Sequence, residues 1–107
     1  MTSIKARNVN HPGHRENLKA DKYHIIREAM LNALPLEDWM PFSALEERVR
    51  AYLEEKDVPK SLFPKPGSVR WYCKAVQLDL EARGEIERQP RKSPLRLRRI
   101  REDRPCL

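Results

Sequence analysis

The sequence predicts an α+β fold, mostly α-helical, in which a core of three helices is closed by a C-terminal β-hairpin and preceded by an N-terminal arm. Residues 66–100 contain a segment of helical periodicity, then a glycine, then two short strand-like runs joined by a basic tip. Upstream, two further segments of helical periodicity end at or before prolines. At 107 residues the chain supports one small domain. We divide it into an arm (1–18), the domain (19–100) and a basic tail (101–107).

Residues 1–18 have no usable periodicity and contain a Pro-Gly pair, so we expect an extended or loosely packed arm. The first helix should run from about Ala20 or Asp21 to Leu34, where a proline follows. Its apolar residues at helical spacing are Tyr23, Ile26, Met30, Ala33 and Leu34.

Residues 35–42 form a connector with large apolar side chains, which should pack on the core and leave room for a very short strand. Ser43 is predicted to cap the second helix, because Glu46 three residues later completes a capping box. This helix should end near Lys56, ahead of a proline. Its inner face is predicted to comprise Leu45, Val49, Tyr52 and Leu53.

The third helix should follow the proline-rich turn at 61–67, with Ser68 as its cap. It should run to about Arg83, with Gly84 supplying the left-handed residue after its end. The core face is predicted to contain Val69, Tyr72, Cys73, Val76 and Leu80. A polar stripe beside it contains Arg70, Lys74, Gln77 and Glu81, and a second apolar stripe contains Trp71, Ala75, Leu78 and Ala82. A helix that is apolar on two sides needs a second cover, from the hairpin, the arm or a partner subunit.

Asp79 lies between the two apolar sectors of this helix. Burying a carboxylate alone costs several kcal/mol, roughly, so a buried Asp79 needs a partner. A basic or histidine group from the arm is one candidate. The alternative is simple exposure at the helix end.

The hairpin strands are predicted at 85–89 and 95–99, joined by a loop at 90–93. A register that places Ile86 and Leu97 on one face sets residue 89 opposite residue 94. The same register pairs opposite charges, Glu87 with Arg96 and Glu85 with Arg98. Cross-strand pairs of this kind contribute roughly 0.2–1 kcal/mol each, enough to favour a register.

Charge suggests one class of partner. The chain has 22 Lys and Arg against 16 Asp and Glu, a formal net charge of +6, and the basic excess lies at the two ends and in the ribbon. Such a distribution fits nucleic acid or another anionic surface, and a solvated tail explains it equally well.

Several function classes are not expected. No run approaches the ~20 apolar residues of a membrane span, and no signal peptide is visible. Cys73 and Cys106 are too isolated for a disulfide framework, which favours the cytoplasm. His11 and His14 flank a turn without a close second ligand pair, so we expect no metal. Without a phosphate loop, a nucleophile elbow or an HExxH motif, we expect neither a cofactor nor an enzyme.

Three helices closed by a ribbon resemble the winged-helix superfamily. The segments NVNHPG (8–13), DKYHIIREAML (21–31) and VQLDLEARGEIER (76–88) are similar to a family of small uncharacterised bacterial proteins of winged-helix type. The resemblance implies the fold and makes the NVNHPG segment a recurrent part of the domain. It carries no activity to transfer, and DNA binding follows from it by fold-level analogy only.

Two functions are compatible with these observations. In the first, the protein binds double-stranded DNA, as a transcription accessory factor for example. Arg70, Lys74 and Gln77 would then enter the major groove, while Arg91 and Lys92 touch the backbone. In the second, the same scaffold is a protein-interaction or homodimerisation module that uses Trp71 and Leu78. Either way, each of these side chains has the alternative role of an ordinary solvated or core residue.

Overall fold

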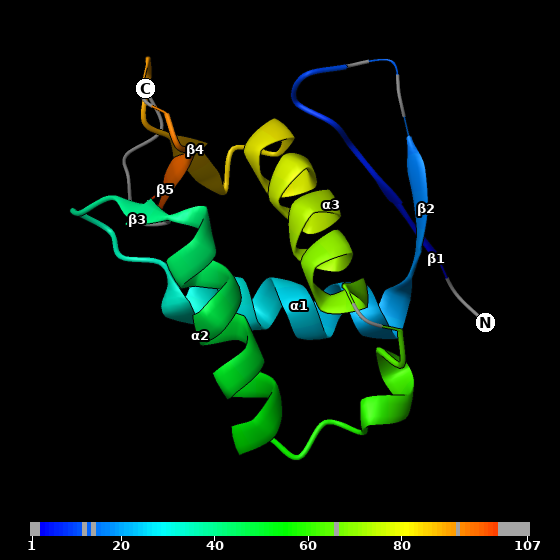
Figure 1. Cartoon of the computed structure of the whole chain (residues 1–107). Helices are drawn as coiled ribbons and strands as arrows, with labels where there is room; N and C mark the ends of the chain where they lie inside the picture. The colour runs from blue at the N-terminus through cyan, green and yellow to red at the C-terminus, as the bar shows by residue number, and fades with distance from the viewer. Residues whose placement is uncertain (1–2, 12, 14, 66, 92, 101–107) are drawn as a thin grey trace.

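Three helices pack against one another, and two small antiparallel sheets flank them (Figure 1). The computed structural model describes residues 3–100 apart from 12, 14, 66 and 92. The elements in chain order are β1 (Ser3–Ala6), β2 (Glu16–Lys19), α1 (Ala20–Ala33), β3 (Met40–Pro41), α2 (Phe42–Glu55), the short 3-10 helix η1 (Lys60–Leu62), α3 (Ser68–Ala82), β4 (Ile86–Arg88) and β5 (Arg96–Arg99). The predicted α+β class with three helices is confirmed.

The predicted extents of α1 and α2 agree closely with the structure. α1 ends at Ala33 because Leu34 precedes a proline and adopts an extended backbone, with ψ 132°. α2 ends at Glu55, beside the predicted stop at Lys56. The fully buried side chains of the two helices are Tyr23, Ile26, Ala29 and Met30 in α1, and Leu45, Val49 and Leu53 in α2.

The capping box predicted at the start of α2 is wrong. The helix begins at Phe42, its N-cap is Pro41, and no side chain caps it. The N–H of Phe42 instead donates to the carbonyl oxygen of Leu95, at 3.0 Å. A backbone group from the C-terminal hairpin therefore satisfies the helix end, and Ser43 and Glu46 lie inside the first turns.

Ser68 does not cap α3 either, because the N-cap is Gly67, whose φ of 83° is the left-handed conformation that glycine adopts readily. The Ser68 hydroxyl is buried and has no hydrogen-bond partner within the described part of the chain. The other end is as predicted, with Gly84 at φ 77°. There the N–H of Glu85 donates to the carbonyl oxygen of Leu80, at 2.9 Å, as in a Schellman motif.

The C-terminal sheet has the strand order β3-β5-β4, so the short strand suspected in the connector is present. Its register differs from the prediction by two residues: Ile86 pairs with Arg99, Glu87 with Arg98, and Arg88 with Leu97. A two-residue shift keeps every side chain on its face, so Ile86 and Leu97 stay buried. β3 also pairs with β5, and the Leu95 carbonyl accepts a hydrogen bond from the start of α2. The prediction considered only the two hairpin strands and so did not include these two contacts.

The N-terminal segment contains a packed hairpin. Of the two alternatives predicted for this arm, its strands are extended, and loose packing is wrong. β1 and β2 pair antiparallel, with Ile4 opposite Leu18 and Ala6 opposite Glu16. Ala6 and Leu18 are each 1% exposed, and the strands contact α1 and α3. Four-residue strands with so few apolar residues leave no periodicity to detect, so the sequence pattern did not predict this hairpin.

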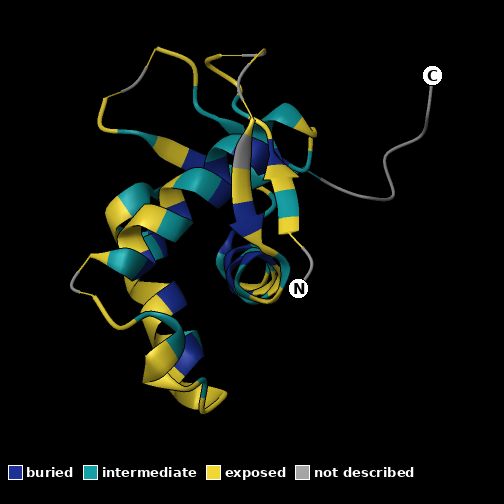
Figure 2. Cartoon of the chain, turned by 90° about the vertical axis from the view of Figure 1, so that its right-hand side faces the viewer, coloured by how far each residue is buried: buried dark blue, intermediate teal, exposed yellow. Residues whose placement is uncertain are grey.

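The core lies where the three helices meet both sheets, as the dark blue segments of Figure 2 show. The helices and strands other than η1 contribute side chains to it or pack against it, and its buried members include Ala6, Leu18, Ile26, Met30, Leu45, Val49, Val76, Leu80, Ile86 and Leu97. Cys73 is also buried there, and burial raises the pKa of its thiol to about 12. Its expected role as a small apolar filler agrees with this position.

Candidate functional site

The third helix lies between the two hairpins. On one side, the carboxylate of Glu81 accepts hydrogen bonds from the guanidinium of Arg88 in β4, one of them 2.8 Å long. On the other side, Asp79 accepts the backbone N–H of Arg7, which follows β1, at 2.7 Å. Between these contacts, α3 presents an outward face that neither hairpin covers completely.

Two of the predicted basic residues lie together on this face. The side chain of Arg70 is 72% exposed, and Lys74 is exposed as well. Both line a hollow of 430 Å³ whose other walls are the start of α2, including Phe42, and the hairpin loop at Pro94 and Leu95. The hollow therefore joins α3 to the C-terminal hairpin.

Arg91 is also exposed, in the hairpin loop, with a left-handed φ of 57°. Lys92, the other residue predicted at this tip, lies outside the described residues. Arg96 extends the exposed basic residues along β5 and has no ion pair within the described part of the chain.

Gln77 does not lie on the exposed stripe where the sequence placed it. It is 0% exposed, and its Nε2 donates to the carboxylate of Glu81. The C-terminal sheet packs against this side of α3, through the Arg88–Glu81 ion pair, and a helical projection cannot show which side is covered. Gln77 is therefore unavailable to read a base edge.

Two acidic residues near the outward face, Glu81 and Glu46, are engaged by arginines, whereas Glu47, which lines the same hollow, is exposed. Glu81 has a side chain only 4% exposed and pairs with Arg88. Glu46 accepts a 2.9 Å hydrogen bond from Arg50 and lies 3.6 Å from the Nε of Arg70. Both Glu81 and Glu46 have at least one arginine partner, which limits their repulsion of an approaching anion.

Lys74 is held between apolar and cationic neighbours. Its Nζ lies 5.3 Å from the centroid of the Phe42 ring. Partial burial lowers the pKa of the Lys74 ammonium, and the nearby Arg88 adds to the decrease. Pairing with an anion would relieve this unfavourable setting.

The hairpin arginines pair differently from the prediction. Glu87 pairs with Arg98 at 3.2 Å, and Arg98 stacks 4.2 Å above the ring of Trp39. Glu85 pairs with Arg27 of α1, so the ion pair links the hairpin to the helices. As a result Arg96, expected to be neutralised by Glu87, remains exposed.

The predicted apolar surface is small. Trp71 is 49% exposed and packs edge-on against Tyr72, with 5.2 Å between ring centroids. Leu78 is half-buried, as are the two alanines of the same stripe. The N-terminal hairpin contacts α3 on this flank, so what remains open is centred on Trp71.

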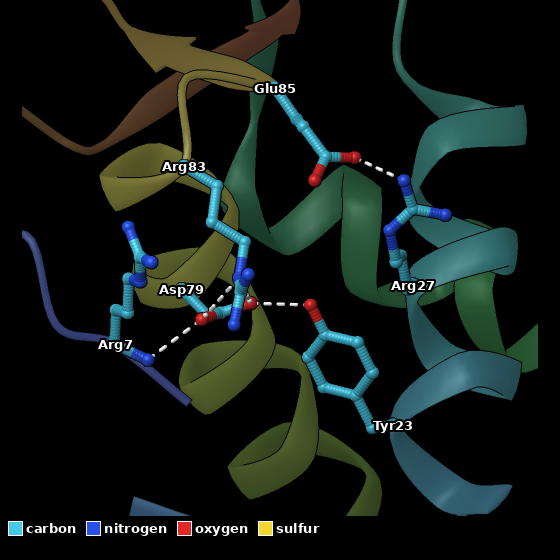
Figure 3. Close-up of polar contacts among 6 residues, drawn as sticks. All are labelled: Arg7, Tyr23, Arg27, Asp79, Arg83 and Glu85. Atoms are coloured by element: carbon cyan, nitrogen blue, oxygen red, sulfur yellow. Dashed lines mark hydrogen bonds and ion pairs between the residues drawn. The ribbon is translucent and has the colours of Figure 1, made fainter. Parts of the chain in front are cut away.

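A buried polar cluster surrounds Asp79, so of the two alternatives for this residue the buried one is confirmed, while Tyr23 and Arg83 were not predicted as its partners (Figure 3). The carboxylate is 0% exposed and accepts hydrogen bonds from the Tyr23 hydroxyl, the Arg7 backbone and the Nε of Arg83, the last at 2.9 Å to each oxygen. Burial raises the pKa of Tyr23, and its hydrogen bond to Asp79 raises it further. The expected partner from the N-terminal segment exists, but it is a backbone N–H. The cluster joins the end of β1 with α1 and α3. Its signal in the sequence was Asp79 itself, between the two apolar sectors of α3, while Tyr23 was assigned only to the apolar face of α1.

Other kinds of site find no support in the described residues. Across residues 3–100, with the four omitted positions set aside, no three His, Cys, Asp or Glu side chains come together in a way that could hold a metal ion. None of the helices in this part of the chain is long and apolar enough to cross a membrane.

Comparison with known proteins gives one match. A family described only as a family of unknown function (DUF6958) matches residues 3–97. No curated protein and no solved structure matches the chain. The matched range begins at the first residue of β1 and ends within β5, so the N-terminal hairpin is an integral part of the family's domain.

Proposed function

We propose that the chain, which belongs to this family of unknown function, is a DNA-binding protein of winged-helix type. The element order supports the winged-helix arrangement. A short strand between the first two helices pairs with the last strand of a hairpin that follows the third helix, giving the order β3-β5-β4. In this arrangement α3 is the recognition helix and the β4–β5 hairpin is the wing.

The observation that supports DNA binding most directly is the set of exposed cations on α3 and the wing: Arg70, Lys74, Arg91 and Arg96. Three of the acids beside them, Glu46, Glu81 and Glu87, are bound by the arginines Arg50, Arg88 and Arg98 of the same chain, while Glu47 stays exposed at the edge of the hollow. A phosphate backbone attracts such exposed cations and gains affinity from the counterions that they displace.

The burial of Gln77 changes the expected mode of DNA recognition. Arg70 can still fork onto guanine, and Lys74 can reach the same base, but no adenine reader remains among the predicted residues. Phosphate contacts fix position and carry little sequence information. We therefore expect strong salt dependence and weak sequence preference from a single copy, with two copies on adjacent half-sites binding more tightly.

Fluorescence anisotropy with a mixed-sequence duplex at low salt tests the proposal. We expect saturable binding, and we expect Arg91→Ala to lower the slope of log affinity against log salt by about one unit, because one phosphate contact is lost. Lys60→Ala is the matched control, since Lys60 is exposed in η1 at the opposite end of the molecule from the wing (Figure 1).

Two results would count against DNA binding. One is the absence of any anisotropy change at tens of micromolar protein. The other is an equal loss of affinity in Lys60→Ala and Arg91→Ala, which would mean that net charge alone attracts the duplex.

A second candidate function is protein interaction on the same scaffold. The 49% exposure of Trp71 favours it, because large aromatic side chains at that exposure are typical anchors of protein interfaces. On this alternative the cations of the wing would be solvated side chains, and Trp71 would carry the affinity.

A further inference from the structure

A second basic hollow lies on the other flank of α3, between the N-terminal hairpin loop and the end of the helix. It has a volume of 290 Å³. The residues that line it are Arg7, Asn8, Val9, Arg15 and Ala82. Two of these are arginines, and no acidic residue is found among the lining side chains that the structure describes, whereas Glu46 and Glu47 line the hollow beside the wing. The composition of this second hollow suits an anion.

Arg7 is anchored through its backbone, and its side chain is left for other contacts. The N–H of Arg7 donates to Asp79 at 2.7 Å, which fixes the end of β1 against α3. The residue is exposed, and its guanidinium extends away from the Asp79 contact (Figure 3). No ion pair of this guanidinium is found among the described side chains. A guanidinium with a fixed base is well suited to bind phosphate oxygens as a fork.

The loop between the strands begins with a turn held by Asn8. Its carbonyl oxygen accepts the N–H of His11 at 3.1 Å, and its side-chain Oδ1 accepts the N–H of Asn10 at 2.9 Å. These bonds hold the side-chain amide of Asn8 in place. Its two Nδ2 hydrogens are donors that this turn does not use. The wall of the hollow is thus organised before a ligand arrives.

The position of this hollow relates it to the outward face of α3. Asp79, which binds the N-terminal hairpin, and Glu81, which binds the wing, are two residues apart and so point about 160° away from each other around the helix. The two hairpins therefore flank α3 on opposite sides. A duplex that lies along the outward face would meet the wing on one side and the N-terminal loop on the other.

We propose that this hollow binds a phosphate group of the DNA backbone through Arg7 and Arg15, so that the N-terminal hairpin acts as a second wing. This inference rests on the proposed function. It adds a contact that faces the backbone on the side opposite Arg91.

Duplex binding by two double variants tests the inference. Arg7→Gln/Arg15→Gln removes both cations of the hollow, and Lys5→Gln/Lys19→Gln removes two exposed cations of the same hairpin that do not line it. We expect the arginine variant to lower the log–log salt slope by about two units and the lysine variant to leave it unchanged. Because Asp79 binds the backbone of Arg7, the arginine variant should keep its thermal unfolding midpoint. If it unfolds, Arg15→Gln alone should lower the slope by about one unit.

The possible outcomes separate the inference from the proposed function. If the wild type binds the duplex and the two double variants behave alike, the second wing is wrong and DNA binding stands. If the wild type does not bind the duplex, both fail.

An NMR titration with inorganic phosphate distinguishes the source of the anion. With the duplex, we expect the amide resonances of Asn8, Val9 and Asn10 to shift in the wild type and not in Arg7→Gln/Arg15→Gln. If inorganic phosphate shifts these resonances and the duplex does not, the hollow takes a free anion, and the assignment to the DNA backbone is overturned.

Discussion

At the scale of single residues, Asp79 determines how the N-terminal segment is held. A buried carboxylate is tolerated only when its oxygens are hydrogen-bonded and its charge is matched. Here Arg83 supplies the charge, while Arg7 and Tyr23 supply further donors from two other elements. The raised pKa of Tyr23 keeps its hydroxyl protonated at neutral pH, so it remains a donor. One acidic side chain thereby fixes a hairpin to a helix far along the chain.

The Tyr23 hydroxyl is therefore expected to contribute measurably to stability. Tyr23→Phe leaves a buried carboxylate with one donor fewer, and we expect the free energy of unfolding to fall by about 1–3 kcal/mol. Urea denaturation followed by circular dichroism measures this. Tyr52→Phe is the matched control, because the Tyr52 hydroxyl bonds Glu28 at the surface and its loss should cost less than about 0.5 kcal/mol. Equal losses in the two variants would show that the buried cluster has no special role.

For the residues predicted to contact DNA, the sequence predicted exposure correctly at some positions and wrongly at others. The helical projection of α3 correctly placed Arg70 and Lys74 on an exposed face, because their distance from the apolar sector is a local property. It misplaced Gln77, which the C-terminal sheet covers, since that packing depends on residues far from the helix in sequence. Arg7 was missed because its segment was not expected to be ordered.

At the scale of elements, neither α2 nor α3 begins with a serine cap. α2 begins with a tertiary hydrogen bond to the Leu95 carbonyl, and α3 begins with Gly67 in the left-handed conformation. The predicted caps and the observed structure give different expectations for Ser43→Ala and Ser68→Ala. Loss of a serine N-cap costs about 1 kcal/mol. We expect Ser43→Ala to change the free energy of unfolding by less than about 0.5 kcal/mol, and Ser68→Ala to be neutral or slightly stabilising because it removes a buried unpaired hydroxyl.

Thermal or urea unfolding of the two serine variants provides the measurement. Asp79→Ala is a useful reference for a large effect, since it leaves the Tyr23 hydroxyl and the Arg83 guanidinium without their shared acceptor. If Ser43→Ala lowered the free energy of unfolding by about 1 kcal/mol or more, the result would support the capping box after all.

The sequence was informative about helices and poor on strands. Apolar spacing and prolines act locally, and they located α1, α2 and α3 closely. The wing register was wrong by two residues because opposite-charge pairing fits both registers and both keep Ile86 inside. The N-terminal hairpin was missed because its four-residue strands carry few apolar residues and leave no alternation to detect.

At the scale of the whole molecule, DNA binding and self-association depend on different surfaces. Arg91 lies in the wing loop, and Trp71 lies in the first turn of α3. If Trp71 does not mediate self-association, sedimentation velocity at high micromolar concentration should show a monomer for both the wild type and Trp71→Ala. A dimer that Trp71→Ala dissociates and Arg91→Ala leaves intact would favour the interaction module over the DNA-binding protein.

The strand order of the C-terminal sheet has a consequence for the order of events during synthesis. β5 is the last of the strands in the described part of the chain, yet it is the central strand, between β3 and β4. Until β5 emerges from the ribosome, both neighbours lack a partner, the start of α2 lacks the Leu95 carbonyl, and Leu97 is missing from the core. Proteins can fold from the N-terminus as they are made, but this domain can close only after its final strand arrives. In the interval the edges of β3 and β4 are unpaired, and unpaired strand edges are templates for aggregation.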